Sequence, residues 1–188
     1  MRTIVLFGDS MLGRYTRQRI EQLEQRVGQD AVVVNCAAGG WTSTEGLRRA
    51  AIVARIRPDV VVLSFGGNDC RPDLRVDRER FSANLAAITA AFTPAEAVAF
   101  LPPSMIERDG VGRGGRTNAD LAGYRDLLAD AVHGRVLDTD AALGPMLAEG
   151  TPVHEDGLHL TGDAYRLVTP VLADVIRETL AHQPDRTH

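Results

Sequence analysis

Residues 4–10 read Ile4-Val5-Leu6-Phe7-Gly8-Asp9-Ser10, and this stretch decides the fold of the chain. Four apolar residues in succession, two of them β-branched, are typical of a strand that is buried in a parallel sheet. Gly8-Asp9-Ser10 ends the run, and a helical pattern begins about one turn later. In an open α/β sheet, ligands bind at the carboxyl ends of the strands. Ser10 therefore lies where a nucleophile would meet a ligand, although Gly-Asp-Ser is also an ordinary turn and N-cap sequence.

The composition limits the class of protein. The chain has 188 residues, of which 44% are hydrophobic and 24% charged, and this suits one globular domain with one core. A formal net charge of −4 gives no signature of polyanion binding, so we expect no nucleic-acid partner. No apolar run is long enough to span a bilayer and no signal peptide is visible. We expect a cytoplasmic protein without integral membrane association, although a mature secreted form would have the same sequence.

Strand and helix patterns alternate along the whole chain. Strands are predicted over residues 4–7, 31–35, 60–65, 97–101 and 135–138, helices over residues 12–27, 43–56, 78–92, 118–132 and 162–182, and a short helix or turn over residues 140–149. This alternation with short connections predicts an α/β fold, a three-layer α/β/α sandwich of about five parallel strands with right-handed crossovers. We expect one domain over residues 1–182 and a frayed tail over residues 183–188.

Glycines and polar side chains end each of the first three strands. The first strand ends in Gly8-Asp9-Ser10, the second runs into residues 35–40, and the third ends in Gly66-Gly67-Asn68-Asp69. Because parallel strands open on the same edge of a sheet, these segments should surround one crevice. Glycines let the backbone come close to a ligand, and an asparagine adds a side-chain donor. Several donors that converge near a serine oxygen would form an oxyanion hole.

Residues 156–159, Asp156-Gly157-Leu158-His159, offer a base and a group to orient it. A carboxylate and an imidazole on a tight loop can hydrogen-bond each other, which leaves the other ring nitrogen for a serine. Alone, this spacing is more often a pair on a surface loop. His154 and Glu155 are the nearest rivals for the two roles, but the spacing favours Asp156 and His159, and we expect His154 at the loop surface.

Together these segments resemble the sequence blocks of the SGNH (GDSL-type) hydrolase superfamily. Residues 8–10, 39–40, 66–69 and 156–159 occur in the order of the family's blocks and span nearly the whole chain. The resemblance implies a flavodoxin-like sandwich and a serine esterase that hydrolyses carboxylic esters or thioesters through an acyl-enzyme. It implies no metal and no cofactor. No long apolar lid helix is evident, which favours short acyl groups.

The resemblance also implies a role for individual residues. Ser10 resembles the nucleophile, His159 the general base and Asp156 its orienting carboxylate. The oxyanion donors would be the backbone N–H groups of Ser10 and Gly40 and the side-chain amide of Asn68. Gly39 is the competitor of Gly40.

The chain departs from the family pattern at two positions. Met11 stands where leucine often follows the serine, and Leu160 stands where proline often follows the histidine. Neither departure touches a chemical role, although the second affects the local stiffness of the loop. Two alternative functions would use the same crevice. One is an acyltransferase that passes the acyl group to a sugar or alcohol, and the other is a binding module without catalysis.

Several other residues have two interpretations. Asp9 and Asp69 are expected to shape turns by local hydrogen bonds. Trp41 could pack the start of a helix or wall the substrate site. The aperiodic, glycine-rich segment 104–117 reads as a mobile loop, and within it residues 112–116 suit a flexible lid or site rim better than a phosphate loop, because they do not run from a strand into a helix. Cys36 and Cys70 are expected to be reduced thiols.

Overall fold

A parallel five-stranded sheet forms the centre of the molecule, in the order β2-β1-β3-β4-β5. The computed structural model describes residues 1–182, so the tail predicted over residues 183–188 lies outside the described residues. The strands are β1 (Arg2–Gly8), β2 (Ala31–Asn35), β3 (Val60–Ser64), β4 (Glu96–Phe100) and β5 (Val136–Leu137). The helices are α1 (Ser10–Gly13), α2 (Arg17–Val27), α3 (Ser43–Val53), α4 (Arg78–Phe92), α5 (Asn118–Ala131), α6 (Thr139–Ala148) and α7 (Gly162–Ala181), with 3-10 turns η1 (Ala54–Ile56) and η2 (Arg113–Gly115).

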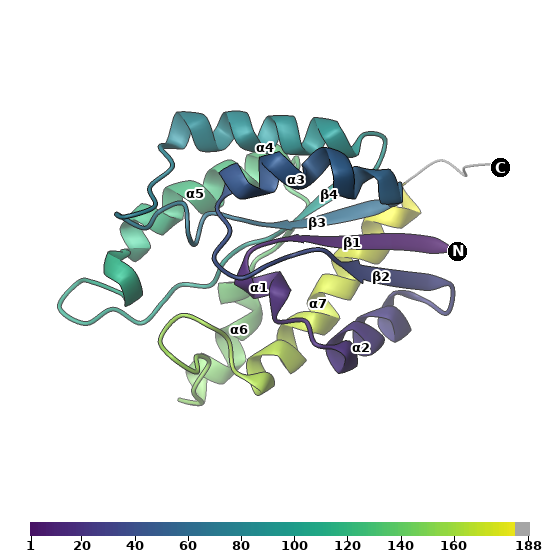
Figure 1. Cartoon of the computed structure of the whole chain (residues 1–188). Helices are drawn as coiled ribbons and strands as arrows, with labels where there is room; N and C mark the ends of the chain where they lie inside the picture. The colour runs from purple at the N-terminus through teal and green to yellow at the C-terminus, as the bar shows by residue number, and fades with distance from the viewer. Residues whose placement is uncertain (183–188) are drawn as a thin grey trace.

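The helices cover both faces of the sheet. Helices α3, α4 and α5 pack side by side on one face, and α2, α6 and α7 pack on the other (Figure 1). This arrangement confirms the predicted three-layer α/β/α sandwich with five parallel strands. No helix within residues 1–182 is long and apolar enough to cross a membrane.

Strand β1 lies in the interior of the sheet, between β2 and β3, and its side chains from Ile4 to Phe7 are fully buried. Its last residue, Gly8, pairs with Ser64 of β3. A Cβ atom at Gly8 would lie 2.2 Å from the Ser64 carbonyl oxygen. Only glycine allows the two strands to stay paired up to this point, so Gly8 fixes where the chain leaves the sheet.

One predicted element is wrong in its limits. The helix predicted over residues 12–27 is two helices, because α1 begins at Ser10 itself and Thr16 adopts an extended conformation before α2. The Asp9 side chain accepts a hydrogen bond from the Met11 N–H at 2.9 Å and so caps α1. The segment 140–149, predicted as a short helix or turn, is helix α6, and Thr161 caps α7 as expected.

Candidate active site

Ser10, His159 and Asp156 lie in hydrogen-bonding contact at the carboxyl edge of the sheet. The Ser10 Oγ atom is 3.0 Å from His159 Nε2, and His159 Nδ1 is 2.8 Å from Asp156 Oδ2. Ser10 is the first residue of α1, directly after β1, whereas the other two residues come from the loop that precedes α7. The fold thus brings the Ser10 hydroxyl to the imidazole and the carboxylate of this loop, although Ser10 and His159 are 149 positions apart in the sequence. In this order the imidazole can take a proton from the hydroxyl.

The Asp156 carboxylate is held by several donors. Its Oδ1 atom accepts the backbone N–H groups of His159 at 2.9 Å and Leu158 at 3.2 Å, and Arg113 forms an ion pair with its Oδ2 atom. Partial burial acts to raise the pKa of Asp156, but the N–H groups and the imidazole together hold that pKa far below its ordinary value. The carboxylate is therefore ionised at neutral pH and orients the N–H of His159 Nδ1.

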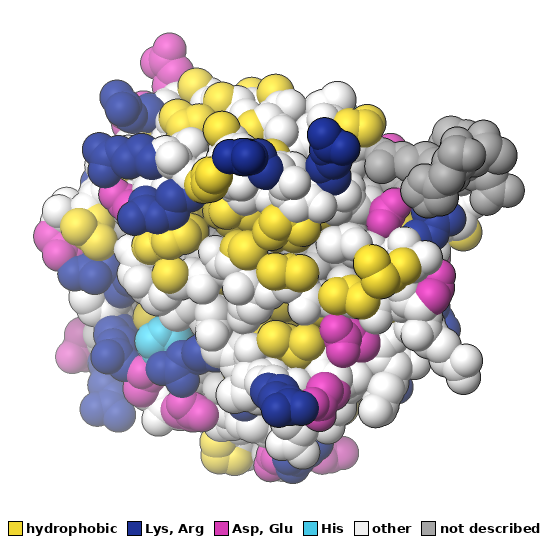
Figure 2. Space-filling view, turned by 45° about the vertical axis from the view of Figure 1, so that its right-hand side comes forward, with side chains coloured by type: hydrophobic (Ala, Val, Ile, Leu, Met, Phe, Trp, Pro, Cys, Tyr) yellow, Lys and Arg dark blue, Asp and Glu magenta, His cyan; other side chains and the backbone are white. Residues whose placement is uncertain are grey.

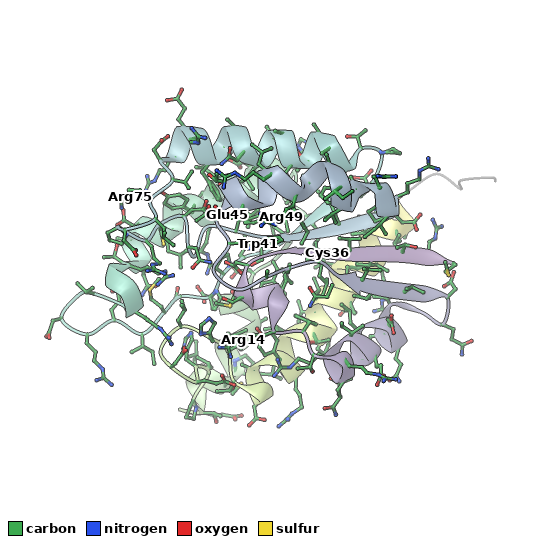
Figure 3. The ribbon with its side chains drawn as sticks, in the orientation of Figure 1. Arg14, Cys36, Trp41, Glu45, Arg49 and Arg75 are labelled. Carbon is green, nitrogen blue, oxygen red and sulfur yellow. The ribbon has the colours of Figure 1, made fainter. Side chains whose placement is uncertain are left out.

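The two rivals of this pair lie elsewhere. Glu155 pairs with Arg14 at 2.8 Å and does not contact His159 through its side chain. Arg14 follows α1 on the side of α7 and the loop before it (Figure 3). His154 does not lie at the loop surface as predicted, because both its ring nitrogens are buried. It lines a separate cavity of about 520 Å³ with apolar side chains that include Leu143 and Val153, and burial lowers its pKa.

A cavity of about 410 Å³ opens beside Ser10. It is lined by Ser10, Gly13, Arg14, Gly39, Gly40, Asn68, Arg71, Arg113, Arg116, Leu158 and His159. Ser10 stands at the N-terminus of α1, where the backbone N–H has no acceptor within the helix. Gly40 adopts a φ of 81°, and both it and its competitor Gly39 line the cavity. The structure thus brings four of the five predicted site residues to one cavity, and the fifth, Asp156, lies behind His159 in contact with its ring.

The Asn68 side chain is fixed at both ends of its amide. Its Nδ2 atom donates to the Trp41 carbonyl oxygen at 2.9 Å, and its Oδ1 atom accepts from Arg116 Nη2 at 2.8 Å. A primary amide has two N–H groups. One of them is used by Trp41, so the second is available to a ligand in the cavity.

Two buried carboxyl groups support the turns around the site. Asp69 accepts the backbone N–H groups of Ser43 at 2.8 Å and Gly66 at 3.0 Å, which ties the start of α3 to the turn after β3. Asp9 caps α1 and accepts from Ser64 Oγ at 3.3 Å. Both residues therefore shape turns, as expected from the sequence. Burial raises the pKa of Asp9 to about 7, with a further contribution from Asp69, against the lowering effect of its hydrogen bonds.

Replacing Asp9 with asparagine is expected to make the stability of the folded protein less sensitive to high pH. A carboxyl whose pKa is raised from 3.8 to about 7 in the folded state contributes stability below pH 3.8 that is lost as pH rises through 7. The loss is at most about 4 kcal/mol. Asparagine keeps the acceptor that caps α1 and has no charge to bury. Burial also raises the pKa of Asp69, which both proteins keep. Thermal melts of both proteins at about pH 5 and about pH 8.5 should therefore show a larger fall in melting temperature for the wild type than for the variant. An equal fall in both proteins would contradict the effect.

Trp41 is half-buried and packs against the core. Its ring meets Phe7 edge to face with centroids 6.0 Å apart, and the Arg49 guanidinium lies 4.5 Å from the ring centroid (Figure 3). Trp41 does not line the cavity beside Ser10. Of its two interpretations, the structure favours packing at the start of α3. Cys36 and Cys70 are both free thiols, as expected.

Sequence reasoning missed the inward position of one arginine, Arg116. Residues 112–116 were expected to form a lid or rim, and Arg113 does lie at the rim, but Arg116 is only 4% exposed. The predicted loop also contains the turn η2 and a bridge between Arg108 and Val111. Its composition offers no sign of which guanidinium turns inward.

In the space-filling view a histidine side chain is visible between basic side chains (Figure 2).

No group of three or more histidine, cysteine or acidic side chains within residues 1–182 is arranged to hold a metal ion. The site chemistry that the described residues offer is that of a hydroxyl, an imidazole, a carboxylate and N–H donors.

Comparisons with known proteins identify a family by sequence and similar folds among solved structures. The profile of the GDSL-like Lipase/Acylhydrolase family matches residues 6–167. Among solved structures, a lipase/acylhydrolase from Enterococcus faecalis is similar over 100% of both chains, with a TM-score of 0.80 and 24% identity. An acetyl xylan esterase, AlAXEase, has a TM-score of 0.74 and 19% identity over 95% of this chain and 99% of its own. A carbohydrate acetylesterase family member from Sinorhizobium meliloti has a TM-score of 0.75 and 21% identity over 96% of this chain and 100% of its own.

A comparison with curated proteins gave no match. The three structural likenesses are each below 25% identity and show the fold, whereas the family profile covers most of the chain and includes all four sequence blocks. The chain therefore belongs to the GDSL-like Lipase/Acylhydrolase family and is a hydrolase that acts on ester bonds.

Proposed function

We propose that this protein is a serine esterase that hydrolyses carboxylic esters or thioesters through an acyl-enzyme on Ser10. The observation that carries the proposal is the 3.0 Å contact between Ser10 Oγ and His159 Nε2. A serine hydroxyl is a weak nucleophile at neutral pH unless a base takes its proton. His159 Nε2 lies close enough to Ser10 Oγ to take that proton, and Nδ1 of the same ring is held by the ionised Asp156 carboxylate at 2.8 Å.

The reaction follows from this geometry. His159 Nε2 takes the Ser10 proton as Oγ attacks the acyl carbon, and the protonated imidazole is stabilised by Asp156. His159 then gives the proton to the leaving alkoxide or thiolate, which departs and leaves the acyl group on Ser10. Water enters, loses a proton to His159 and attacks the acyl carbon. The acid is released and Ser10 recovers its proton.

The oxyanion formed in each half of the reaction needs donors. The backbone N–H groups of Ser10 and Gly40 and the free N–H of the Asn68 amide come from three separate strand ends and line the same cavity as the nucleophile. Donors fixed in advance at the place where charge develops lower the barrier because they need not reorganise. The rigid attachment of Asn68 at both ends of its amide supports this role.

The cavity favours short acyl groups. Leu158 is its one aliphatic lining side chain among the described residues, and the rest of the lining is glycine, arginine and polar side chains. The more apolar cavity near His154 shares no lining residue with it. A long acyl chain would therefore lie against polar groups or solvent rather than in an apolar tunnel.

The test combines turnover with labelling. We expect hydrolysis of p-nitrophenyl acetate and butyrate, a decline in kcat/KM with longer chains, and labelling of Ser10 by a fluorophosphonate, mapped by peptide mass spectrometry. Parallel reactions with acyl-CoA and acetylated sugars would identify the leaving group. An added alcohol that captured most of the acyl group would indicate an acyltransferase. Absence of both turnover and labelling would contradict the proposal and favour a binding module.

Replacing Asn68 with alanine is expected to lower kcat by roughly 10²–10³, because one oxyanion donor is lost. KM and the melting temperature should change little, since the amide lies at the cavity and its removal leaves the sheet intact. Steady-state kinetics on p-nitrophenyl acetate would measure the effect. A folded variant with full kcat would remove Asn68 from the site.

A further inference from the structure

Arg116 is a buried charge without an ion pair. Its side chain is 4% exposed, and within residues 1–182 its guanidinium contacts only uncharged oxygen atoms. Nε donates to the Gly67 carbonyl, Nη1 to the Arg113 carbonyl at 2.6 Å and Nη2 to Asn68 Oδ1 at 2.8 Å. Burial lowers the pKa of this group, yet a guanidinium stays charged in proteins. The carboxylates of Asp9 and Asp73 attract this charge, but among the described residues none pairs with it directly. A buried charge without a direct partner costs stability, so a functional reason is to be sought.

The hydrogen bond from Arg116 to Asn68 Oδ1 fixes which end of the Asn68 amide carries the oxygen. A guanidinium can only donate, and the Trp41 carbonyl on the other side can only accept. If the amide were turned over, its NH₂ group would face the Arg116 donors and its oxygen would face the Trp41 oxygen. Arg116 therefore holds the Asn68 oxygen away from the place where an oxyanion would form and leaves an N–H in the cavity. A charged donor on the amide oxygen also polarises the amide and strengthens its N–H as a donor.

The segment that carries Arg116 is built to let its side chain fold back. Gly114 adopts a φ of 71°, and a Cβ atom there would lie 2.7 Å from Arg116 Nη1. The same guanidinium holds the carbonyl of Arg113, whose own side chain forms the ion pair with Asp156. One short stretch of chain thus contacts the Asn68 amide at one end and the carboxylate beside His159 at the other.

We infer that Arg116 is a positioning residue for ester hydrolysis, which orients the Asn68 amide so that its N–H meets the oxyanion. The inference rests on the proposed function. It deepens that function by adding a residue at the cavity that acts through the Asn68 amide.

The first test is the kinetics of single variants. Arg116→Gln removes the charge and the fork of donors, and kcat on p-nitrophenyl acetate is expected to fall about tenfold to a hundredfold, within the loss caused by removing the donor itself. KM should stay near the wild-type value, because the oxyanion exists only after attack begins. Arg116→Lys keeps the charge and a donor but not the planar set of N–H donors of the guanidinium, so its kcat should lie between that of Arg116→Gln and that of the wild type. It also serves as the second variant if the glutamine variant fails to fold, as judged by circular dichroism.

The decisive test is a double-mutant cycle with Asn68→Ala. If Arg116 acts through the Asn68 amide, the Arg116 substitution should lower kcat little or not at all once that amide is absent. A merely structural role would lower kcat by the same factor in both backgrounds, and that result would overturn the inference. Arg71→Gln is the matched control, since the Arg71 side chain lines the same cavity but pairs with Asp73 rather than with the Asn68 amide. The backbone hydrogen bond from the Arg71 N–H to the Asn68 carbonyl is kept in this variant, and the effect of this substitution should be equal in both backgrounds.

The outcomes separate this inference from the proposed function. If Ser10 is labelled and esters are hydrolysed, but the cycle is additive or Arg116→Gln keeps full kcat, the esterase stands and the positioning role fails. If Asn68→Ala itself keeps full kcat while Ser10 is labelled, both the oxyanion role of Asn68 and the role of Arg116 fail. If the wild type neither hydrolyses esters nor reacts with the fluorophosphonate, the proposed function fails first.

Discussion

Replacing Ser10 with alanine is expected to lower kcat for p-nitrophenyl acetate by about 10⁶-fold, to the level that binding and oxyanion donors alone can sustain. The reason is that no other hydroxyl among the described residues is held 3.0 Å from His159 Nε2. His159→Ala should cost a similar factor, because the hydroxyl loses its base. The double variant should be no slower than either single one, since the two groups act as a unit.

A serine outside the site provides the control for this prediction. Ser82 is exposed on α4, far from the loop that carries His159, and Ser82→Ala should keep the wild-type kcat. Melting temperatures of all variants would show that they are folded. A folded Ser10→Ala protein that still hydrolysed the ester at an appreciable fraction of the wild-type rate would rule out the acyl-enzyme on this residue.

Asp156→Asn is expected to lower kcat by about 10⁴-fold at neutral pH. The carboxylate accepts the N–H of His159 Nδ1 at 2.8 Å, which leaves Nε2 as the acceptor for the Ser10 proton. An asparagine that turned its NH₂ group to the ring would favour the other tautomer, and Nε2 would then carry a proton and could not act as the base. The variant also lacks the partner of Arg113, but that ion pair is partly exposed and contributes little to stability.

The neighbouring carboxylate is a matched control for charge. Glu155 lies next to Asp156 in the same loop and pairs with Arg14 rather than with the imidazole. Glu155→Gln removes the same charge at nearly the same place, and kcat should stay near the wild-type value. If both variants lost activity equally, the effect would be one of loop charge or loop structure, and the orienting role of Asp156 would be wrong.

Much of the fold is predictable because its signals are local. Apolar runs such as residues 4–7 and 60–65 can only be buried strands, and the glycines that follow them mark the edge where ligands bind. The meeting of Ser10, Asp156 and His159 was expected from the same logic together with the family resemblance. The split between α1 and α2 was missed, because Asp9 caps a helix two residues before the predicted start and the chain is extended at Thr16.

The role of Arg116 could not be predicted, since it depends on a contact between residues 48 positions apart. An arginine among glycines has no periodicity that would distinguish an inward side chain from an exposed one. His154 was missed for a similar reason: a polar residue in an irregular loop was expected at the surface, but its ring lies beneath that loop. Such side chains are placed by the packing of neighbouring segments, which the local sequence does not encode.

The wide separation of Ser10 and His159 has a consequence for how the protein acquires activity. Strand β1 leaves the ribosome before the other strands of the sheet, whereas the imidazole of His159 follows 149 positions after Ser10, and its loop is anchored by α7, which packs on α2. Contacts between such distant segments form late, because a large loop must close before they are gained. A nascent or truncated chain without the last loop would thus carry an inert serine, and ester turnover would report that the whole polypeptide has reached its native state.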